Sequence, residues 1–218
     1  RFGVSGTANF TGAFNVVGTA TFTGLLNLAS YTAGVIVSSS TGVISNQGGM
    51  VLLNTLSPSG VASTNDTTSF TATYRNYMIT FDNVTPATNT TIFSMQVATS
   101  GSNFTTASYV SFIAVTGVGA FTSATSFVLS GASATTSVAS STLYGLNGSI
   151  LLSNPAGSVP RKSISGLTAW AVASSGFTAL VGQPFGWFDG NSNPVTGINF
   201  LFSSGNIATG TIKIYGMS

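Results

Sequence analysis

The sequence predicts an all-β protein in which a short, repetitive, trimeric β shaft leads into an antiparallel β-sandwich of jelly-roll-like form. Three observations support this prediction. A twelve-residue repeat opens the chain, about ten strand-like segments follow it, and no window of helical length has apolar residues at three- and four-residue spacing. Glutamate, a good helix former, is absent altogether.

The repeat is visible when residues 2–13 (FGVSGTANFTGA) are laid over residues 14–25 (FNVVGTATFTGL). Apolar and polar residues nearly alternate in each unit and glycines punctuate it, which is typical of short strands joined by tight turns. A unit of this size cannot bury its own apolar face. Three chains wound about one axis would bury the phenylalanines and leave no open strand edge. The alternative is an extended linker of low complexity.

Changes in residue composition and pattern divide the sequence into three parts. Residues 1–30 are the predicted fibre shaft, residues 31–49 a neck or linker with a hairpin-like pattern, and residues 50–218 the C-terminal β-sandwich domain. Within this domain, alternating or continuous apolar runs bounded by turn residues predict the strands. The expected strands are residues 50–56, 69–73, 77–83, 91–99, 109–115, 126–129, 143–153, 162–171, 197–203 and 210–215.

The composition excludes several classes of protein. Charged residues make up 4% of the chain, against roughly 25% in an average domain, and its 43% of hydrophobic residues excludes intrinsic disorder. The sequence has no continuous apolar run of about 18 residues, so no membrane span is predicted. The five basic residues are too few and too scattered for nucleic-acid binding. Because so few charges protect the strand edges, we expect oligomerisation or sheet wrapping to close them.

Three segments resemble a known family of domains. Residues 76–96 (NYMITFDNVTPATNTTIFSMQ), 148–170 (GSILLSNPAGSVPRKSISGLTAW) and 195–217 (VTGINFLFSSGNIATGTIKIYGM) resemble the C-terminal β-sandwich of phage tail-fibre and virion-appendage proteins, in the same order. The resemblance covers about residues 50–218, and SGNIATGTIKIYG is its most specific part. The N-terminal repeat is similar to the GTATFTG-type units of trimeric phage fibre shafts. The resemblance implies a virion-attached, usually trimeric, surface-exposed module.

The residues offer little for catalysis or metal binding. Histidine, cysteine and glutamate, which carry most acid-base chemistry, are missing. The carboxylates are Asp66, Asp82 and Asp189, widely separated in sequence, and hydrogen bonds to nearby turn backbone are the expected role of the first two. A serine-lysine pair would need Lys162 beside Ser163, for which we expect ordinary surface exposure. We therefore expect a protein that is not an enzyme, with no catalytic residue, metal site or cofactor.

One aromatic-rich stretch between predicted strands is the candidate binding site for a receptor or glycan. Aromatic faces stack on sugar rings, and amides and carboxylates bind sugar hydroxyls. The candidate residues are Gln183, Phe185, Trp187, Phe188, Asp189, Asn191 and Asn193. The alternative, which large aromatic side chains favour, is that Phe185, Trp187 and Phe188 fill the sandwich core or the trimer interface.

Together these features predict a structural component of a phage virion appendage, a tail fibre, on the particle surface, with host-surface attachment through the C-terminal domain. The expected partners are two further copies of the chain, other virion proteins through the N-terminal side, and a host cell-surface glycan or protein. The alternatives are a head-decorating or assembly fibre with a purely structural role and, less favoured, a polysaccharide-cleaving spike or a bacterial adhesin.

Overall fold

The structure is a computed structural model that describes residues 36–38, 44–46, 49–131, 135–141, 143–158, 161–172 and 178–217. The chain divides into two units, Arg1–Ala33 and Gly34–Ser218, and every described residue belongs to the second. The predicted shaft, residues 1–30, lies outside the described residues, as does much of the predicted neck. Two short strands of the neck, β1 (Ile36–Ser38) and β2 (Ile44–Asn46), pair antiparallel as the expected hairpin.

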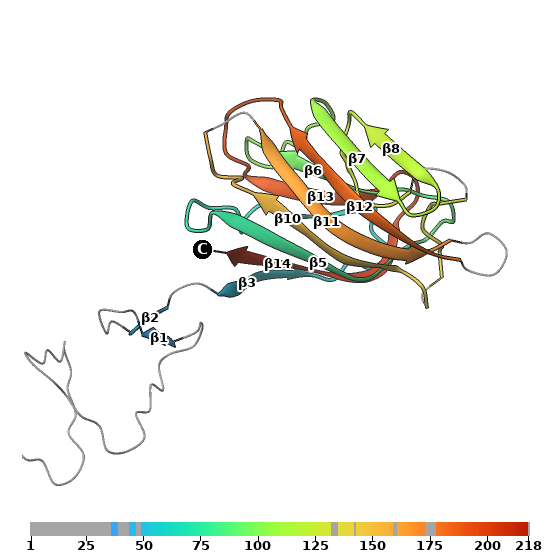
Figure 1. The fold of residues 1–218 in the computed structure, drawn as a ribbon, viewed down its shortest axis with the longest axis horizontal. Helices are drawn as coiled ribbons and strands as arrows, with labels where there is room; N and C mark the ends of the chain where they lie inside the picture. Colours follow the sequence, from blue (N-terminus) through green and yellow to red (C-terminus); the bar gives the residue numbers. More distant parts are fainter. Residues whose placement is uncertain are drawn as a thin grey trace, which may run out of the picture. The chain divides into compact units, whose positions relative to one another are not determined.

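All other described elements are β strands of two sheets (Figure 1). They are β3 (Met50–Leu56), β4 (Ser63–Asp66), β5 (Asn76–Pro86), β6 (Phe93–Ala98), β7 (Tyr109–Val115), β8 (Gly119–Ser123), β9 (Phe127–Val128), β10 (Leu146–Ser153), β11 (Lys162–Ala171), β12 (Ala179–Phe188), β13 (Gly197–Phe202) and β14 (Ile207–Met217). No helix of the described part is long and apolar enough to cross a membrane.

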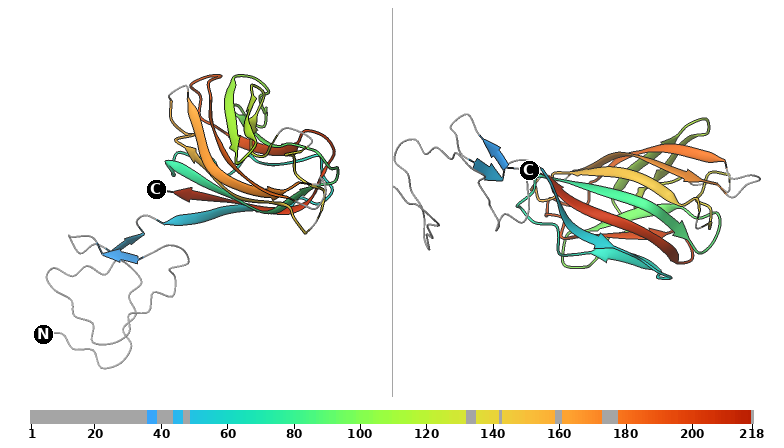
Figure 2. Two further views of the ribbon diagram at one scale, coloured as in Figure 1. Left: turned by 45° about the vertical axis from the view of Figure 1, so that its right-hand side comes forward. Right: turned by 90° about the horizontal axis from the view of Figure 1, so that it is seen from below.

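The strands form one larger and one smaller sheet, and their pairings are antiparallel. The larger sheet has eight strands in the order β3-β14-β5-β10-β11-β12-β7-β8, and the smaller has four in the order β4-β13-β6-β9. The larger sheet is strongly twisted, as the two views of Figure 2 show. In its central strands, such as β7, β11 and β12, buried and more exposed residues alternate, which gives the larger sheet an inner face and an outer face.

Aromatic side chains from both sheets meet in one hydrophobic core. The ring of Phe81 on β5 lies 5.5 Å from Phe93 on β6 and 5.6 Å from Phe200 on β13, measured between centroids. On the same inner face, toward the β8 edge of the larger sheet, the ring of Tyr109 on β7 lies 5.0 Å from that of Phe127 on β9. The two sheets therefore pack face to face, and the prediction of an all-β, antiparallel β-sandwich is confirmed.

The predicted strands agree with the observed ones where apolar residues alternate or run on without interruption. Predicted segments 50–56, 109–115 and 162–171 coincide with β3, β7 and β11. The strand predicted at residues 69–73 is wrong, because this segment forms a bend and a turn after β4. The structure also has three strands that the sequence did not predict, β4, β8 and β12.

The missed strand β12 contains glycine and proline at inward-facing positions, which lowers its strand propensity. Gly182 is one of them, and its lack of a side chain has a packing reason. A Cβ atom at this position would lie 2.6 Å from Cδ1 of Ile113 and 2.8 Å from the ring of Trp170. The glycine thus makes room for the buried indole of β11.

Trp170 provides a test of this packing, because its indole both fills the core and makes a polar contact. It is 3% exposed, and its Nε1 donates a hydrogen bond to the carbonyl oxygen of Thr136 at 2.6 Å. We expect Trp170→Phe to lower the free energy of unfolding by about 1 to 3 kcal/mol, since phenylalanine lacks the N–H donor. Urea denaturation checks this, with Trp187→Phe on the outer face as the control, and equal losses in both variants would contradict it.

Candidate functional site

Three aromatic side chains, one exposed and two half-buried, form a strip on the outer face of the larger sheet. We define this aromatic strip as Phe112 on β7 and Phe185 and Trp187 on β12. The rings of Phe112 and Phe185 stack with their centroids 5.3 Å apart and their planes 12° apart. Phe185 remains 45% exposed, so the stacked pair presents an apolar surface to solvent. An open hollow of about 300 Å³ adjoins Phe112 between β7 and β8.

Strand periodicity and register place these residues together. In β12, successive side chains point to opposite faces, so Gln183, Phe185 and Trp187 share the outer face. The antiparallel register puts Phe185 directly opposite Phe112 and Trp187 directly opposite Val110. Because β12 lies between β11 and β7, hydrogen bonds on both sides fix the backbone beneath the strip.

Two charged side chains border the aromatic strip at the end of β12. The guanidinium carbon of Arg161 lies 5.4 Å from the centroid of the Trp187 ring, and its Nε lies 3.9 Å from a carboxylate oxygen of Asp189. The two side chains are 68% and 43% exposed, so the ion pair adds little stability. Its position instead gives the strip a polar edge with both donors and acceptors.

The predicted site residues thus separate into two groups. Gln183, Phe185, Trp187 and Asp189 lie at or beside the aromatic strip. Phe188 does not, because it is 1% exposed and packs in the core 5.2 Å from Tyr109, as the alternative interpretation predicted for this residue.

The other two predicted residues belong to the loop that follows β12. The side-chain amide of Asn191 donates to the hydroxyl of Thr99 at 3.0 Å, and its oxygen accepts a hydrogen bond from the backbone N–H of Asn193, also at 3.0 Å. Asn191 therefore holds this loop in place. Asn193 is exposed.

Sequence reasoning missed two members of the site and misassigned the secondary structure. The sequence predicts this stretch to lie between strands, whereas its residues up to Phe188 belong to β12. Phe112 was missed, although both faces of its strand carry apolar residues, which is a signal of a second apolar surface. Arg161 was missed because its proximity to Trp187 depends on the pairing of β11 with β12.

The three carboxylates do not converge. Asp66 is buried at the end of β4, Asp82 is exposed within β5, and Asp189 follows β12. The strand pairings show how far apart the last two lie. Phe81, next to Asp82, pairs with Gly148 on β10, which pairs with Thr168 on β11, which in turn pairs with Gly182 on β12. Asp82 is therefore level with Val181, and strand geometry puts Asp189 about 26 Å further along and about 14 Å across the sheet from it. A glycosidase pair needs a separation of roughly 5 to 10 Å.

The serine and lysine of β11 also lie apart. Ser163 is exposed on the outer face, as expected, but Lys162 is fully buried, contrary to the expected surface exposure. Its Nζ donates a hydrogen bond to the carbonyl oxygen of Gly157 at 2.6 Å, and burial lowers the pKa of the amine. Adjacent residues of a strand point to opposite faces, so the two side chains do not form a nucleophile-base pair. Among the described residues, no three acidic, histidine or cysteine side chains cluster as a metal site would require.

A comparison with protein-family models, with curated proteins and with solved structures found no match to this chain.

Proposed function

We propose that the chain is a structural component of a phage virion appendage, a tail fibre, whose β-sandwich attaches the particle to a host surface. The aromatic strip is the observation that carries this proposal, because it combines exposed rings with a polar border on a rigid sheet. The N-terminal repeat and the resemblance of residues 50–218 to appendage domains support it. A trimeric shaft at residues 1–30 and a jelly-roll-like winding of the sandwich are parts of the same proposal.

The strip suits binding to the glycans or proteins of a cell surface. The exposed ring of Phe185 and the half-buried ring of Trp187 would stack against the C–H face of a sugar or against apolar side chains. Arg161, Asp189 and Gln183 would form hydrogen bonds at its edge. One such site binds weakly, but three on one stiff shaft raise the avidity without any new contact.

We expect the double substitution Phe185→Ala and Trp187→Ala to lower host-cell binding of the full chain by tenfold or more, since it removes two of the three rings of the strip. Fluorescently labelled protein and flow cytometry on host cells measure this. Leu143→Ala is the matched control, because it removes an apolar side chain that is 78% exposed outside the strip. Unchanged binding by the double variant at unchanged oligomeric state would contradict attachment through the strip.

A second function, a head-decorating or assembly fibre that contacts only virion proteins, is favoured by the extent of the apolar outer face. Further apolar side chains lie exposed or half-buried across the sheet, well beyond the strip; they are Met50, Leu52, Met78, Leu151, Leu167, Val181 and Tyr215. Contacts between copies of the chain would cover such a face. If the double variant dissociates the oligomer in light scattering, the strip belongs to this contact and the structural role is the better one.

A further inference from the structure

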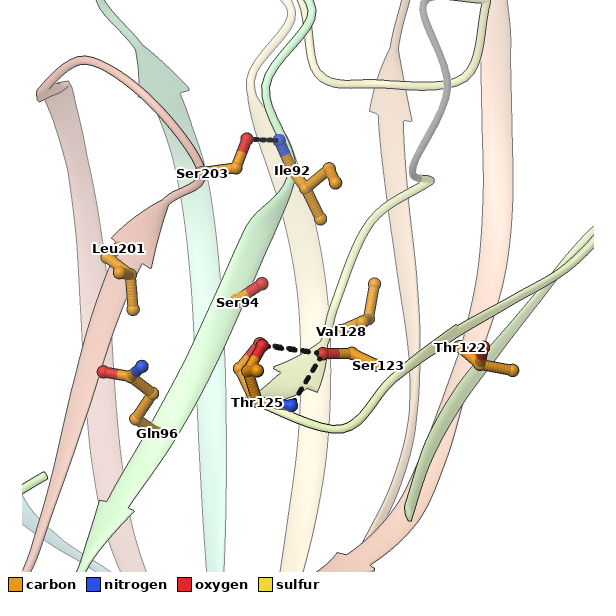
Figure 3. Close-up of a pocket in the computed structure, with 10 residues that line it drawn as sticks. Ile92, Ser94, Gln96, Thr122, Ser123, Thr125, Val128, Leu201 and Ser203 are labelled. Carbon is orange, nitrogen blue, oxygen red and sulfur yellow. Dashed lines mark hydrogen bonds between the residues drawn. The ribbon is translucent and has the colours of Figure 1, made fainter. Parts of the chain in front are cut away.

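A small pocket lies between the smaller sheet and the β8 edge of the larger one. It is bounded by β6, β13, the end of β8 and the connection between β8 and β9, has a volume of about 240 Å³ (Figure 3), and shares Thr122 and Ser123 with the hollow beside Phe112. Apolar atoms of Ile92, Val128 and Leu201 line one part of it, and hydroxyl and amide groups line the rest. The lining residues that the structure describes include no ionisable side chain.

Ser94 is the most informative residue of this pocket. Its side chain lies on the outer face of β6, between the register partners Leu201 and Val128, and only 8% of the residue is exposed. Its hydroxyl makes no hydrogen bond with any residue that the structure describes. The hydroxyl therefore opens into the pocket with its hydrogen-bonding capacity unused by the described part of the chain, and a hydroxyl group of a ligand could pair with it.

A second polar group without a full set of partners lies beside it. Gln96 follows two residues later on the same face of β6, and its oxygen accepts only a long hydrogen bond of 3.5 Å from the amide of Asn199. The oxygen of that asparagine is itself buried, with no hydrogen-bond partner in the described part of the chain. Asn199 does not line the pocket, so the groups that this wall offers a ligand are the Ser94 hydroxyl and the weakly paired Gln96 amide.

The opposite wall carries hydroxyl groups held in fixed positions. The hydroxyl of Ser123 accepts a hydrogen bond from the backbone N–H of Thr125 at 3.2 Å and lies 3.2 Å from the hydroxyl of Thr125. Figure 3 shows these two side chains facing β6 across the pocket from Ser94 and Gln96. Because the hydroxyls are already oriented, a ligand would lose little free energy in ordering them.

These features define the chemistry of a fitting ligand. Hydroxyl and amide groups match the hydroxyls of a sugar, and the aliphatic atoms match its C–H face. An anionic sugar or a phosphate would lose its hydration without gaining a counter-charge. The volume is below the roughly 300 to 1,000 Å³ of sites for drug-sized ligands, so the pocket fits one ring.

We propose that this pocket binds a single neutral sugar ring. The binding itself follows from the pocket alone, but its use in host attachment rests on the proposed function. It would give each copy of the chain a recognition site separate from the Phe185 and Trp187 rings of the aromatic strip.

Saturation-transfer NMR and calorimetry on the full chain test the proposal. The probes are glucose, galactose, mannose and N-acetylglucosamine, with glucuronate and N-acetylneuraminate as the anionic comparison. We expect at least one neutral sugar to bind, and Gln96→Ala and Ser94→Ala each to weaken it tenfold or more. Gln96 is only partly buried, so its variant keeps the test valid if the Ser94 variant unfolds. Ser163→Ala, which removes an exposed hydroxyl from the other sheet, is the matched control and should bind normally.

Several outcomes would overturn the proposal. The proposed binding of a neutral sugar is wrong if no neutral sugar binds, or if the anionic sugars bind more tightly than the neutral ones. The proposed site is also wrong if Phe185→Ala abolishes sugar binding while Gln96→Ala does not. That result would place the sugar on the aromatic strip and would still be consistent with the attachment function. Sugar binding that depends on Gln96, together with no binding to host cells, would support the pocket and contradict the attachment function.

Discussion

Phe200→Ala is expected to lower the free energy of unfolding by about 3 to 5 kcal/mol, the largest effect of any single substitution proposed for this protein. Phe200 on β13 is fully buried, stacks with Phe93 at 5.9 Å and meets the edge of Phe81 at 5.6 Å. These three rings join the smaller sheet to β5 of the larger one. Truncation would leave a cavity between the sheets, because the backbone of a paired strand cannot move in to fill it.

Urea denaturation followed by far-ultraviolet circular dichroism measures this loss. Phe185→Ala is the control, because it removes the same side chain from a position that is 45% exposed. The control should lose no more than about 1 kcal/mol, since little apolar area is removed from the interior. A loss below about 1.5 kcal/mol for Phe200→Ala would show that the sheets do not pack through this cluster.

Asp66→Ala is expected to cost about 3 kcal/mol, because it removes a buried carboxylate that accepts several hydrogen bonds. One carboxylate oxygen accepts from the backbone N–H of Thr68 at 2.8 Å, the hydroxyl of Thr68 at 3.0 Å and the backbone N–H of Ser69 at 3.1 Å. The other accepts from the Ser69 hydroxyl and from the amide of Asn54 at 3.1 Å. As predicted for Asp66, the carboxylate organises the turn that follows it, and it also ties this turn to β3.

The same carboxylate predicts a pH dependence. Burial by itself raises the pKa of Asp66, but the hydrogen bonds from Ser69, Thr68 and Asn54 outweigh it and hold the pKa below its usual value of 3.8. The unfolded chain then binds this proton more tightly than the folded one. The stabilisation is complete above that ordinary, unfolded-state pKa and is lost as the pH falls through the lower folded-state pKa.

Denaturation midpoints between pH 7 and pH 2 check this sign. Asp66→Asn should have a flatter stability profile below about pH 4 than the unsubstituted chain, because it has no proton to bind at this position. Asp82→Asn, at an exposed position, is the control for loss of a carboxylate. Parallel acid profiles for Asp66→Asn and the unsubstituted chain would contradict the role of the Asp66 hydrogen bonds.

The strands could be predicted where local pattern and final environment agree. In β7 and β11 the alternation or continuity of apolar residues directly reflects burial between neighbouring strands. In β12 local preference and environment disagree, because Gly182 is there to accommodate Trp170 of the neighbouring strand. The sequence of β12 alone does not reveal that a small residue is needed opposite the Trp170 indole.

The candidate sites were predictable only in part, for a similar reason. Phe185 and Trp187 stood out as aromatic residues in a polar chain, but the stacking of Phe185 on Phe112 depends on the register of β12 with β7. The pocket around Ser94 combines β6, β13 and the β8–β9 connection, whose residues are unremarkable serines, threonines and a glutamine in the sequence. Lys162 is buried against expectation because a carbonyl of the preceding turn accepts its hydrogen bond.

The placement of β13 and β14 sets the order in which this domain can be built. β14 is the only partner of β3 in the larger sheet, and β13 is the only partner of β4 in the smaller one, among the strands that the structure describes. During synthesis, β3 and β4 can therefore form their strand pairings only after β13 and β14 have left the ribosome. Until then their backbone groups and the apolar side chains of β3 have no partner in the sheet, and closing loops of such length is slow. Folding is thus expected to be completed only after residue 217 is made, with the nascent chain most exposed to premature association just before that point.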